Sequence, residues 1–215
     1  MSETDIRANL AAVQERIAAA ARRAGRREDA VLLVGVSKTV DAERVRAAIA
    51  AGVPALGENR VQEAREKIAI LGRPRPWHLI GHLQTNKVGK ALRWADLIHS
   101  VDRPSLLAAL QGQERKVPVF LQVNVSGEAS KGGYEAATVE GAVAEARRTL
   151  EVRGLMTMAP IGAETRPLFR TLRETAERCG LRELSMGMTQ DYEVAVEEGA
   201  THVRVGTAIF DGVLI

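Results

Sequence analysis

Hydrophobic positions near the N-terminus follow the spacing of an α-helix. They recur at intervals of three or four residues, at Ile6, Leu10, Val13 and Ile17. This spacing gathers them on one face of a helix. Gly25 follows the segment, and glycine is typical of a helix C-terminus. The pattern predicts a helix over about residues 4–24 with one apolar face to bury.

Beyond residue 30, short apolar runs alternate with amphipathic segments. The runs are rich in Val, Ile and Leu, as expected of buried parallel strands. Eight runs occupy residues 31–37, 53–57, 77–81, 96–101, 117–126, 152–158, 181–187 and 201–206. Helical spacing occurs between them, at 41–52, 59–72, 104–113, 138–150, 167–180 and 192–199. Asp41 and Asp191 stand where two of these helices begin and are predicted N-caps.

Eight strands separated by helices predict a (β/α)8 TIM-type barrel with an additional N-terminal helix. A doubly wound open sheet is the alternative, because strand count does not prove closure. Little chain follows the last run, so we expect the N-terminal helix to cover the gap between the last strand and the first. Without a Pro/Ser-rich linker, residues 1–215 are predicted to form one domain, with the barrel over about 30–211.

Composition narrows the class of protein. No apolar run has the length of a membrane span, and the first residues lack a secretory pattern. The single cysteine, Cys179, excludes an internal disulfide, so a cytoplasmic location is expected. The net charge is +3, but arginines alternate with glutamates and aromatic residues make up only 3%. This pattern argues against nucleic-acid binding. Few aromatic residues also favour a monomer.

Candidate chemistry lies where the predicted strands end, because barrel strands converge there on one face. Lys38 directly follows the first run and is either a nucleophilic amine or a solvated loop residue. Arg204 precedes Gly206 by two residues and therefore shares its side of the last strand. That side is predicted to be the barrel interior; the alternative is a surface arginine or a salt-bridged one.

A phosphate site is predicted after the last two strands. Gly206 ends the eighth run and Thr207 follows it, and Ser185 and Gly187 lie at the end of the seventh. The corresponding loops of such barrels recurrently bind phosphate through backbone N–H groups. Plain turns are the alternative interpretation of these small residues.

Other motifs do not support a metal site or a nucleotide-binding site. His78 and His82 are spaced four apart but lack the glutamate of a helical zinc site, so no metal is expected. Neither a dinucleotide fingerprint nor a P-loop is present. A lysine amine, a phosphate site and an inward arginine together suit pyridoxal 5'-phosphate (PLP), which carries an aldehyde, a phosphate and a pyridine nitrogen.

The chain resembles the PLP homeostasis protein family, which is related to the N-terminal domain of alanine racemase. The resemblance spans about residues 32–210, and its motifs include GVSKT, GENRVQE, WHLIGHLQTNK, LSMGMTQD and VRVGTAIF. It implies a barrel that holds PLP for vitamin B6 homeostasis, with Lys38 as the Schiff-base lysine. It further implies that Asn59 lies near the ring and that Arg204 faces the pyridine nitrogen.

The same resemblance implies that Ser185, Gly206 and Thr207 hold the phosphate. Two positions depart from the family pattern. Arg60 stands where tyrosine is more usual, and Asp211 precedes the final glycine. The first leaves the role of that side chain open, whereas the second is expected to shift only the final turn.

The resemblance also implies a PLP-binding protein without clear turnover, which buffers the cofactor or delivers it to PLP-dependent apoenzymes. Related racemases need a second acid/base group from a further domain, whereas this chain ends at Ile215. Neither Tyr134 nor Tyr192 has an evident reason to lie across the cofactor. The alternatives are a stand-alone PLP-dependent racemase or lyase, and a barrel that binds another phosphate ligand without a Schiff base. The loop around Lys131 is either a flap or a solvated loop.

Overall fold

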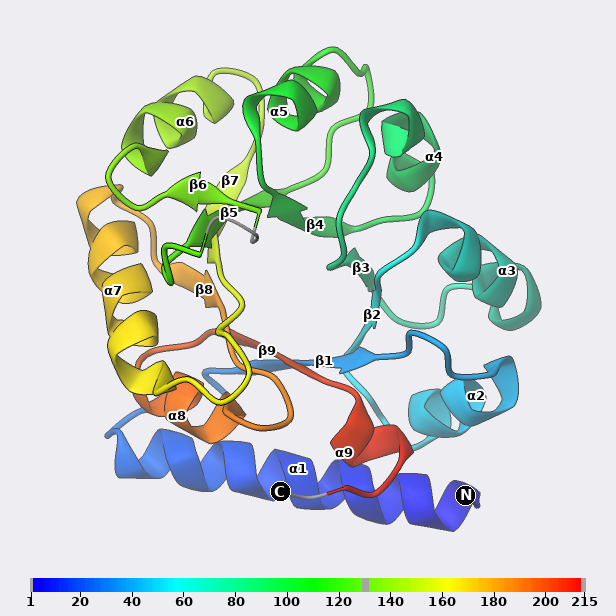
Figure 1. Cartoon of the computed structure of the whole chain (residues 1–215). Coiled ribbons are helices and arrows are strands. Elements are labelled where there is room, and N and C mark those ends of the chain that lie inside the picture. Colours follow the sequence, from blue (N-terminus) through cyan, green and yellow to red (C-terminus); the bar gives the residue numbers. More distant parts are fainter. Residues whose placement is uncertain (1, 129–131, 214–215) are drawn as a thin grey trace.

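A ring of eight parallel strands forms the centre of the molecule in the computed structural model, which describes residues 2–128 and 132–213 (Figure 1). The strands are β1 (Leu32–Val36), β2 (Ala55–Glu58), β3 (Trp77–Leu79), β4 (Leu97–Val101), β5 (Val119–Asn124), β7 (Val152–Met156), β8 (Glu183–Ser185) and β9 (His202–Val205). Each strand lies within one predicted run except β2, which ends one residue beyond its run, at Glu58. The sequence did not predict β6 (Tyr134–Glu135), a short strand that pairs with β5.

Closure of the ring decides between the two predicted architectures. β1 pairs with β2 on one side and with β9 on the other, and β4 pairs with β5. Every strand of the ring therefore has two neighbours, so the sheet is a closed barrel. The predicted (β/α)8 barrel is confirmed, and the doubly wound alternative is wrong.

Helices surround the barrel. They are α2 (Ala42–Ala50), α3 (Val61–Leu71), α4 (Val88–Leu92), α5 (Pro104–Gln111), α6 (Val139–Ala146), α7 (Thr165–Arg178), α8 (Tyr192–Glu197) and α9 (Thr207–Phe210), with a 3₁₀ turn, η1 (Thr85–Lys87). The six predicted helices are present. The sequence missed η1, α4 and α9, because segments this short show too few repeats of the helical period.

The N-terminal helix, α1 (Glu3–Arg23), occupies the remaining place in the helical layer. A capping box between Ser2 and Asp5 begins it. Its predicted apolar face is buried, and it packs against α2, α8 and α9, as Figure 1 shows along the lower edge of the view. The Asn9 side-chain amide donates to the carbonyl of Ile209, 3.1 Å away. Because β1 and β9 are paired directly, α1 fills a gap between helices and not a gap in the sheet.

The two predicted N-caps behave differently. The carboxylate of Asp41 accepts a hydrogen bond from the backbone N–H of Arg44 at 2.8 Å, as a cap does. Asp191 stands at the N-cap position, just before α8, but its carboxylate accepts from the backbone N–H of Met188 at 2.6 Å. It therefore fastens the loop before α8 and does not cap the helix.

Replacing Asp41 with alanine is expected to lower the free energy of unfolding by about 1 kcal/mol, since α2 loses its N-terminal acceptor. Urea denaturation measures the change. Asp41→Asn is the matched control, because its amide oxygen can accept the same bond, and it is expected to remain close to wild type. Equal losses in the two variants would contradict a capping role.

Two further findings concern the predicted absence of a membrane span and the single cysteine. Within the described residues, no helix combines the length and the apolar character needed to cross a membrane. Cys179 follows the last residue of α7 and is buried, and burial raises the pKa of its thiol. A buried thiol held in its protonated form acts as a small packing group.

Candidate functional site

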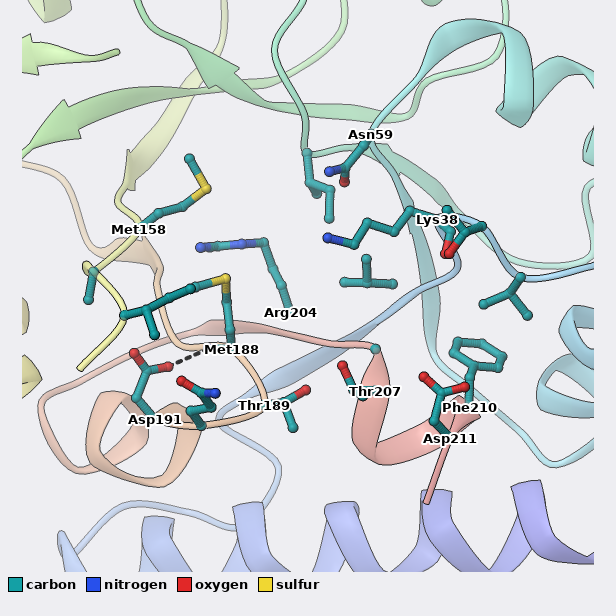
Figure 2. Close-up of a pocket in the computed structure, with 18 of the residues that line it drawn as sticks. Lys38, Asn59, Met158, Met188, Thr189, Asp191, Arg204, Thr207, Phe210 and Asp211 are labelled. Carbon is teal, nitrogen blue, oxygen red and sulfur yellow. Dashed lines mark hydrogen bonds between the residues drawn. The ribbon is translucent and has the colours of Figure 1, made fainter. Parts of the chain in front are cut away.

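A cavity of about 370 Å³ opens at the C-terminal ends of the strands. The topology brings distant segments to its wall, because the loop after each strand emerges at this end of the barrel. Five of the six predicted site residues line it: Lys38, Asn59, Arg204, Gly206 and Thr207. Figure 2 shows the Lys38 and Arg204 side chains reaching into the same space from different strands. Ser185 does not line this cavity.

Lys38 follows β1 and is exposed to the cavity. Among the described residues its amine forms neither a hydrogen bond nor an ion pair, so it is available to a ligand. Thr39, the next residue, has a φ of 62°, in the left-handed region that β-branched residues rarely adopt. Backbone strain of this kind is frequent at functional sites.

A buried ion pair holds the backbone just before Lys38. The Glu58 carboxylate lies 2.5 Å from the ammonium of Lys67 and accepts a hydrogen bond from the Ser37 hydroxyl at 2.7 Å. Lys67 also donates to the Ser37 carbonyl. Burial raises the pKa of Glu58, and the hydrogen bonds from Lys67 and Ser37 oppose this change. The end of β1 is therefore fixed through both the side chain and the backbone of Ser37.

Removing one member of this pair is expected to destabilise the fold. Lys67→Met leaves the Glu58 carboxylate buried without its cation, which costs roughly 3–5 kcal/mol in free energy of unfolding. The double variant Glu58→Leu/Lys67→Met removes both charges and is expected to be clearly more stable than Lys67→Met alone. Urea denaturation of the two variants makes the comparison. An unchanged midpoint in Lys67→Met would contradict the structural importance of the pair.

Arg204 points from β9 into the barrel and is only 4% exposed. One terminal nitrogen donates to the hydroxyl of Ser185 at 2.6 Å, and the other donates to the carbonyl of Thr157 at 2.7 Å. Both acceptors are neutral, and no described residue forms an ion pair with it. Burial lowers the pKa of Arg204 to about 10, a value at which the guanidinium is still a cation at neutral pH. The predicted interior position is found, and the alternative of a surface or salt-bridged arginine is wrong.

Ser185 has a different place from the predicted one. Its side chain is fully buried, and its hydroxyl lies between Arg204 and the ring of His99, whose Nδ1 is 2.7 Å away. β8 ends at this residue and its side chain points into the barrel, so the following loop reaches the cavity in its place. We therefore withdraw the phosphate role expected of Ser185.

The sequence analysis missed Thr189, which lines the cavity from that loop. Figure 2 shows the hydroxyls of Thr189 and Thr207 on the same side of the cavity, below Arg204. The available signal was a second hydroxyl residue four positions after Ser185, within the turn that follows the seventh strand. The position at which that strand ends decides which of the two hydroxyls reaches the cavity.

The turn that begins α9 offers a cradle for an anion. A Cβ added at Gly206 would lie 2.9 Å from the carbonyl oxygen of Val36, so the two loops approach as closely as glycine allows. The amides at the start of a helix have no intrahelical acceptor. The N–H groups after Gly206, together with the hydroxyls of Thr189 and Thr207, suit the oxygens of a phosphate.

Asn59 follows β2, and Figure 2 shows its side-chain amide near the Lys38 amine. Of the two departures from the family pattern, Arg60 has a side chain that is 79% exposed and pairs with Glu63 at 3.2 Å. Asp211 lies at the rim of the cavity and pairs with Arg44 at 2.9 Å. The change at 211 therefore reaches the cavity wall and is more than a shift of the final turn.

We next consider the two tyrosines and the possible metal ligands among the described residues. Neither Tyr134 nor Tyr192 belongs to the cavity wall. In the part of the chain that the structure describes, no three His, Cys, Asp or Glu side chains are arranged to hold a metal ion. The cavity presents an exposed amine, a buried cation that forms no ion pair with a described residue, and an anion cradle. This set is suited to an aldehyde that carries a phosphate.

Residues 8–212 match the family described as the N-terminal domain of alanine racemase. A pyridoxal phosphate homeostasis protein of Aquifex aeolicus is 43% identical over 220 residues, covering 94% of this chain and 95% of that protein. One of Pseudomonas aeruginosa is 44% identical over 215 residues, with coverage of 94% and 93%.

Solved structures agree with this relationship. The structure of PipY from Synechococcus elongatus with PLP bound is similar, with a TM-score of 0.81, 35% identity and coverage of 95% of this chain and 99% of that one. Alanine racemase from Bartonella henselae shares the fold at 14% identity and a TM-score of 0.78, and this chain covers 60% of its length. The protein belongs to the alanine racemase N-terminal domain family and, within it, to the pyridoxal phosphate homeostasis proteins.

Proposed function

We propose that this protein binds PLP as a Schiff base on Lys38 and holds it for intracellular vitamin B6 homeostasis, by buffering the cofactor or delivering it to PLP-dependent apoenzymes. The observation that carries the proposal is the cavity in which an exposed lysine amine faces a buried arginine that forms no ion pair with a described residue. PLP bound to the PipY relative, and the names of the curated relatives, support the choice of cofactor.

Each cavity residue is assigned to one part of the cofactor. Lys38 supplies the amine that condenses with the aldehyde, and Asn59 lies where the ring would be held. Arg204 faces the pyridine nitrogen. Gly206 and Thr207 hold the phosphate, and Thr189 takes the part first expected of Ser185.

Arg204 also determines how reactive the bound cofactor is. PLP supplies an electron sink for carbanion chemistry, and this sink is strongest when its pyridine nitrogen is protonated. A guanidinium donates hydrogen bonds and does not give up its proton under ordinary conditions, so it keeps the ring nitrogen unprotonated. A weakened sink favours a holding protein over an enzyme.

A PLP-dependent racemase or lyase is the competing function. Racemisation needs acid/base groups on both faces of the cofactor, and Lys38 can serve only one face. Tyr134 and Tyr192, which could have offered a phenol, both lie away from the cavity wall. Circular dichroism of L-alanine incubated with the PLP-loaded protein tests this alternative. A steady loss of optical activity would establish turnover.

The covalent link is tested by the absorption spectrum of the PLP-loaded protein before and after borohydride reduction, with mass mapping of the product. We expect a visible band that disappears on reduction and leaves the added mass on the peptide that contains Lys38. Ligand retained without any fixed adduct would overturn the Schiff base and favour a barrel that binds phosphate ligands non-covalently.

Delivery, a monomeric state and a cytoplasmic location belong to the same proposal. Transfer is tested by mixing the PLP-loaded protein with a PLP-dependent apoenzyme, in the presence of a phosphatase that destroys free PLP. Recovery of apoenzyme activity under these conditions supports direct delivery. Recovery only without the phosphatase supports buffering of the free cofactor.

A further inference from the structure

A chain of buried hydrogen bonds leads from Arg204 into the barrel interior. The Arg204 guanidinium lies 2.6 Å from the hydroxyl of Ser185, which lies 2.7 Å from Nδ1 of His99. Nε2 of His99 is 3.0 Å from Nδ1 of His78. All four side chains are buried, and Ser185 and His99 are 0% exposed. Arg204 belongs to the candidate PLP site described above, whereas Ser185, His99 and His78 have no role in that site so far.

The direction of every bond in this chain follows from Arg204. Arginine has donors only, so the Ser185 oxygen must accept from it. The Ser185 hydroxyl proton then has Nδ1 of His99 as its acceptor. His99 is therefore protonated at Nε2 and donates to Nδ1 of His78. The opposite arrangement would leave a buried hydroxyl proton without an acceptor, which costs about 1–3 kcal/mol.

This series of hydrogen bonds requires His99 and His78 to be neutral, and burial keeps them neutral. Burial depresses the pKa of His99 well below its ordinary value and lowers that of His78 to about 4. The ring of His99 also stacks on Phe120, with centroids 4.9 Å apart, which fixes its plane. The histidine end of the chain is therefore rigid and uncharged at neutral pH.

The second terminal nitrogen of Arg204 is held as well. It donates to the backbone carbonyl of Thr157 at 2.7 Å, and the Thr157 hydroxyl donates to the carbonyl of Val123 at 2.8 Å. Fixing both terminal nitrogens defines the plane of the guanidinium. A carboxylate could hold it equally well but would neutralise its charge. Neutral acceptors orient Arg204 while leaving its positive charge for an anionic ligand.

We propose that Ser185 and His99 are positioning residues, which hold the Arg204 guanidinium in the orientation that directs its remaining N–H groups at the pyridine nitrogen of bound PLP. The inference rests on the proposed function, since it assigns a role to Arg204 toward that cofactor. Ser185 thus acts on the ring end of the cofactor through Arg204, and it does not contact the phosphate.

Ser185→Ala tests this role against a matched control. Ser100→Ala also removes a buried hydroxyl from the end of a barrel strand, where Ser100 donates to the carbonyl of Gly81 at 2.6 Å and does not contact Arg204. Both variants are loaded with PLP labelled with ¹⁵N at the pyridine nitrogen. The ¹⁵N chemical shift reports the hydrogen bond at that atom, and stopped-flow transfer to an excess of apoenzyme reports the release rate.

In Ser185→Ala we expect a changed ¹⁵N shift and roughly tenfold faster release, since a hydrogen bond that orients a charged group is lost. Ser100→Ala is expected to keep the wild-type shift and a release rate within about twofold of wild type. A second pair of variants tests His99, the next residue in the series of hydrogen bonds. His99→Leu should reproduce the Ser185→Ala shift, whereas His99→Gln, which retains an acceptor for the Ser185 hydroxyl, should restore the wild-type shift.

A wild-type ¹⁵N shift in both Ser185→Ala and His99→Leu would overturn the positioning role. The ¹⁵N shift is the decisive measurement, because a loss of stability alone does not change it. This result is distinct from failure of the proposed function. If borohydride fixes no PLP on Lys38 of the wild type, the proposed function fails first. If the wild type is labelled on Lys38 and the variants keep its ¹⁵N shift, only the present inference fails.

Discussion

Lys38→Ala is expected to abolish the covalent attachment of PLP while leaving the barrel folded. The Lys38 side chain is exposed and, in the described structure, forms no hydrogen bond or ion pair, so its removal costs the fold little. The ligand would retain the phosphate cradle and Arg204 but lose its bond to the protein. We expect the visible band to disappear and the dissociation constant for PLP to rise by at least roughly 100-fold, about 2.7 kcal/mol.

Absorption spectroscopy and equilibrium dialysis make this measurement, with Lys90→Ala as the control. Lys90 is an exposed lysine of α4 outside the cavity wall, so its loss should change neither the band nor the affinity. An equally strong band in Lys38→Ala would mean that another amine carries the cofactor. An unchanged affinity without a band would mean that the non-covalent contacts are sufficient for binding.

Acid is expected to weaken the fold at a pH above that at which most carboxylates titrate. The histidines of the barrel interior, His78, His99 and His202, are buried, and their rings lie within 5.1–6.3 Å of one another. Burial lowers the pKa of His78 to about 4 and that of His202 to about 3, from an ordinary value of 6.5. The folded state therefore binds these protons much more weakly than the unfolded state.

The sign of the effect follows from this difference. Below pH 6.5 the unfolded state takes up protons that the folded state refuses, so the free energy of unfolding falls as the pH falls toward 4. A tenfold difference in proton affinity corresponds to about 1.4 kcal/mol, so two groups depressed this far account for a loss of several kcal/mol. Glu58 and Asp191, whose pKa values burial raises, oppose the loss in part.

Urea denaturation at pH 7 and at pH 5 tests this expectation. We expect a clearly lower midpoint at pH 5 for the wild type and a smaller difference for His202→Asn, which removes one of the buried histidines whose pKa is lowered. His82→Asn is the matched control, because His82 has a side chain that is 62% exposed and lies beside Asp102. Equal midpoints at the two pH values in the wild type would contradict the buried, neutral state of these rings.

The sequence was most informative where a pattern has a local physical cause. Buried parallel strands need continuous apolar runs, so all eight barrel strands could be predicted from the positions of such runs along the chain. Lys38 and Gly206 could be placed near one another because Lys38 follows the first of those runs and Gly206 ends the last. The spacing of two between Arg204 and Gly206 gave the side of the strand that faces inward, since side chains alternate along a strand.

Ser185 shows where this reasoning fails. The period of two fixes which residues share a side of a strand, but not where the strand ends. Since β8 ends at Ser185, its hydroxyl lies in the interior beside His99, and Thr189 of the next loop reaches the cavity. A difference of a few residues at a strand end moves a hydroxyl from the ligand to the barrel core.

The chain itself determined the number and order of strands, the amphipathic helices and the amine at the end of the first strand, because each depends on neighbours in sequence. Only the tertiary structure decided that the sheet closes, that Lys67 reaches Glu58 across the end of β1, and that His99 lies beside Ser185 of a strand 86 residues away. These contacts depend on strand register and on the convergence of strand ends around a closed barrel. Such geometry is a property of the whole ring of strands, and no local stretch of sequence encodes it.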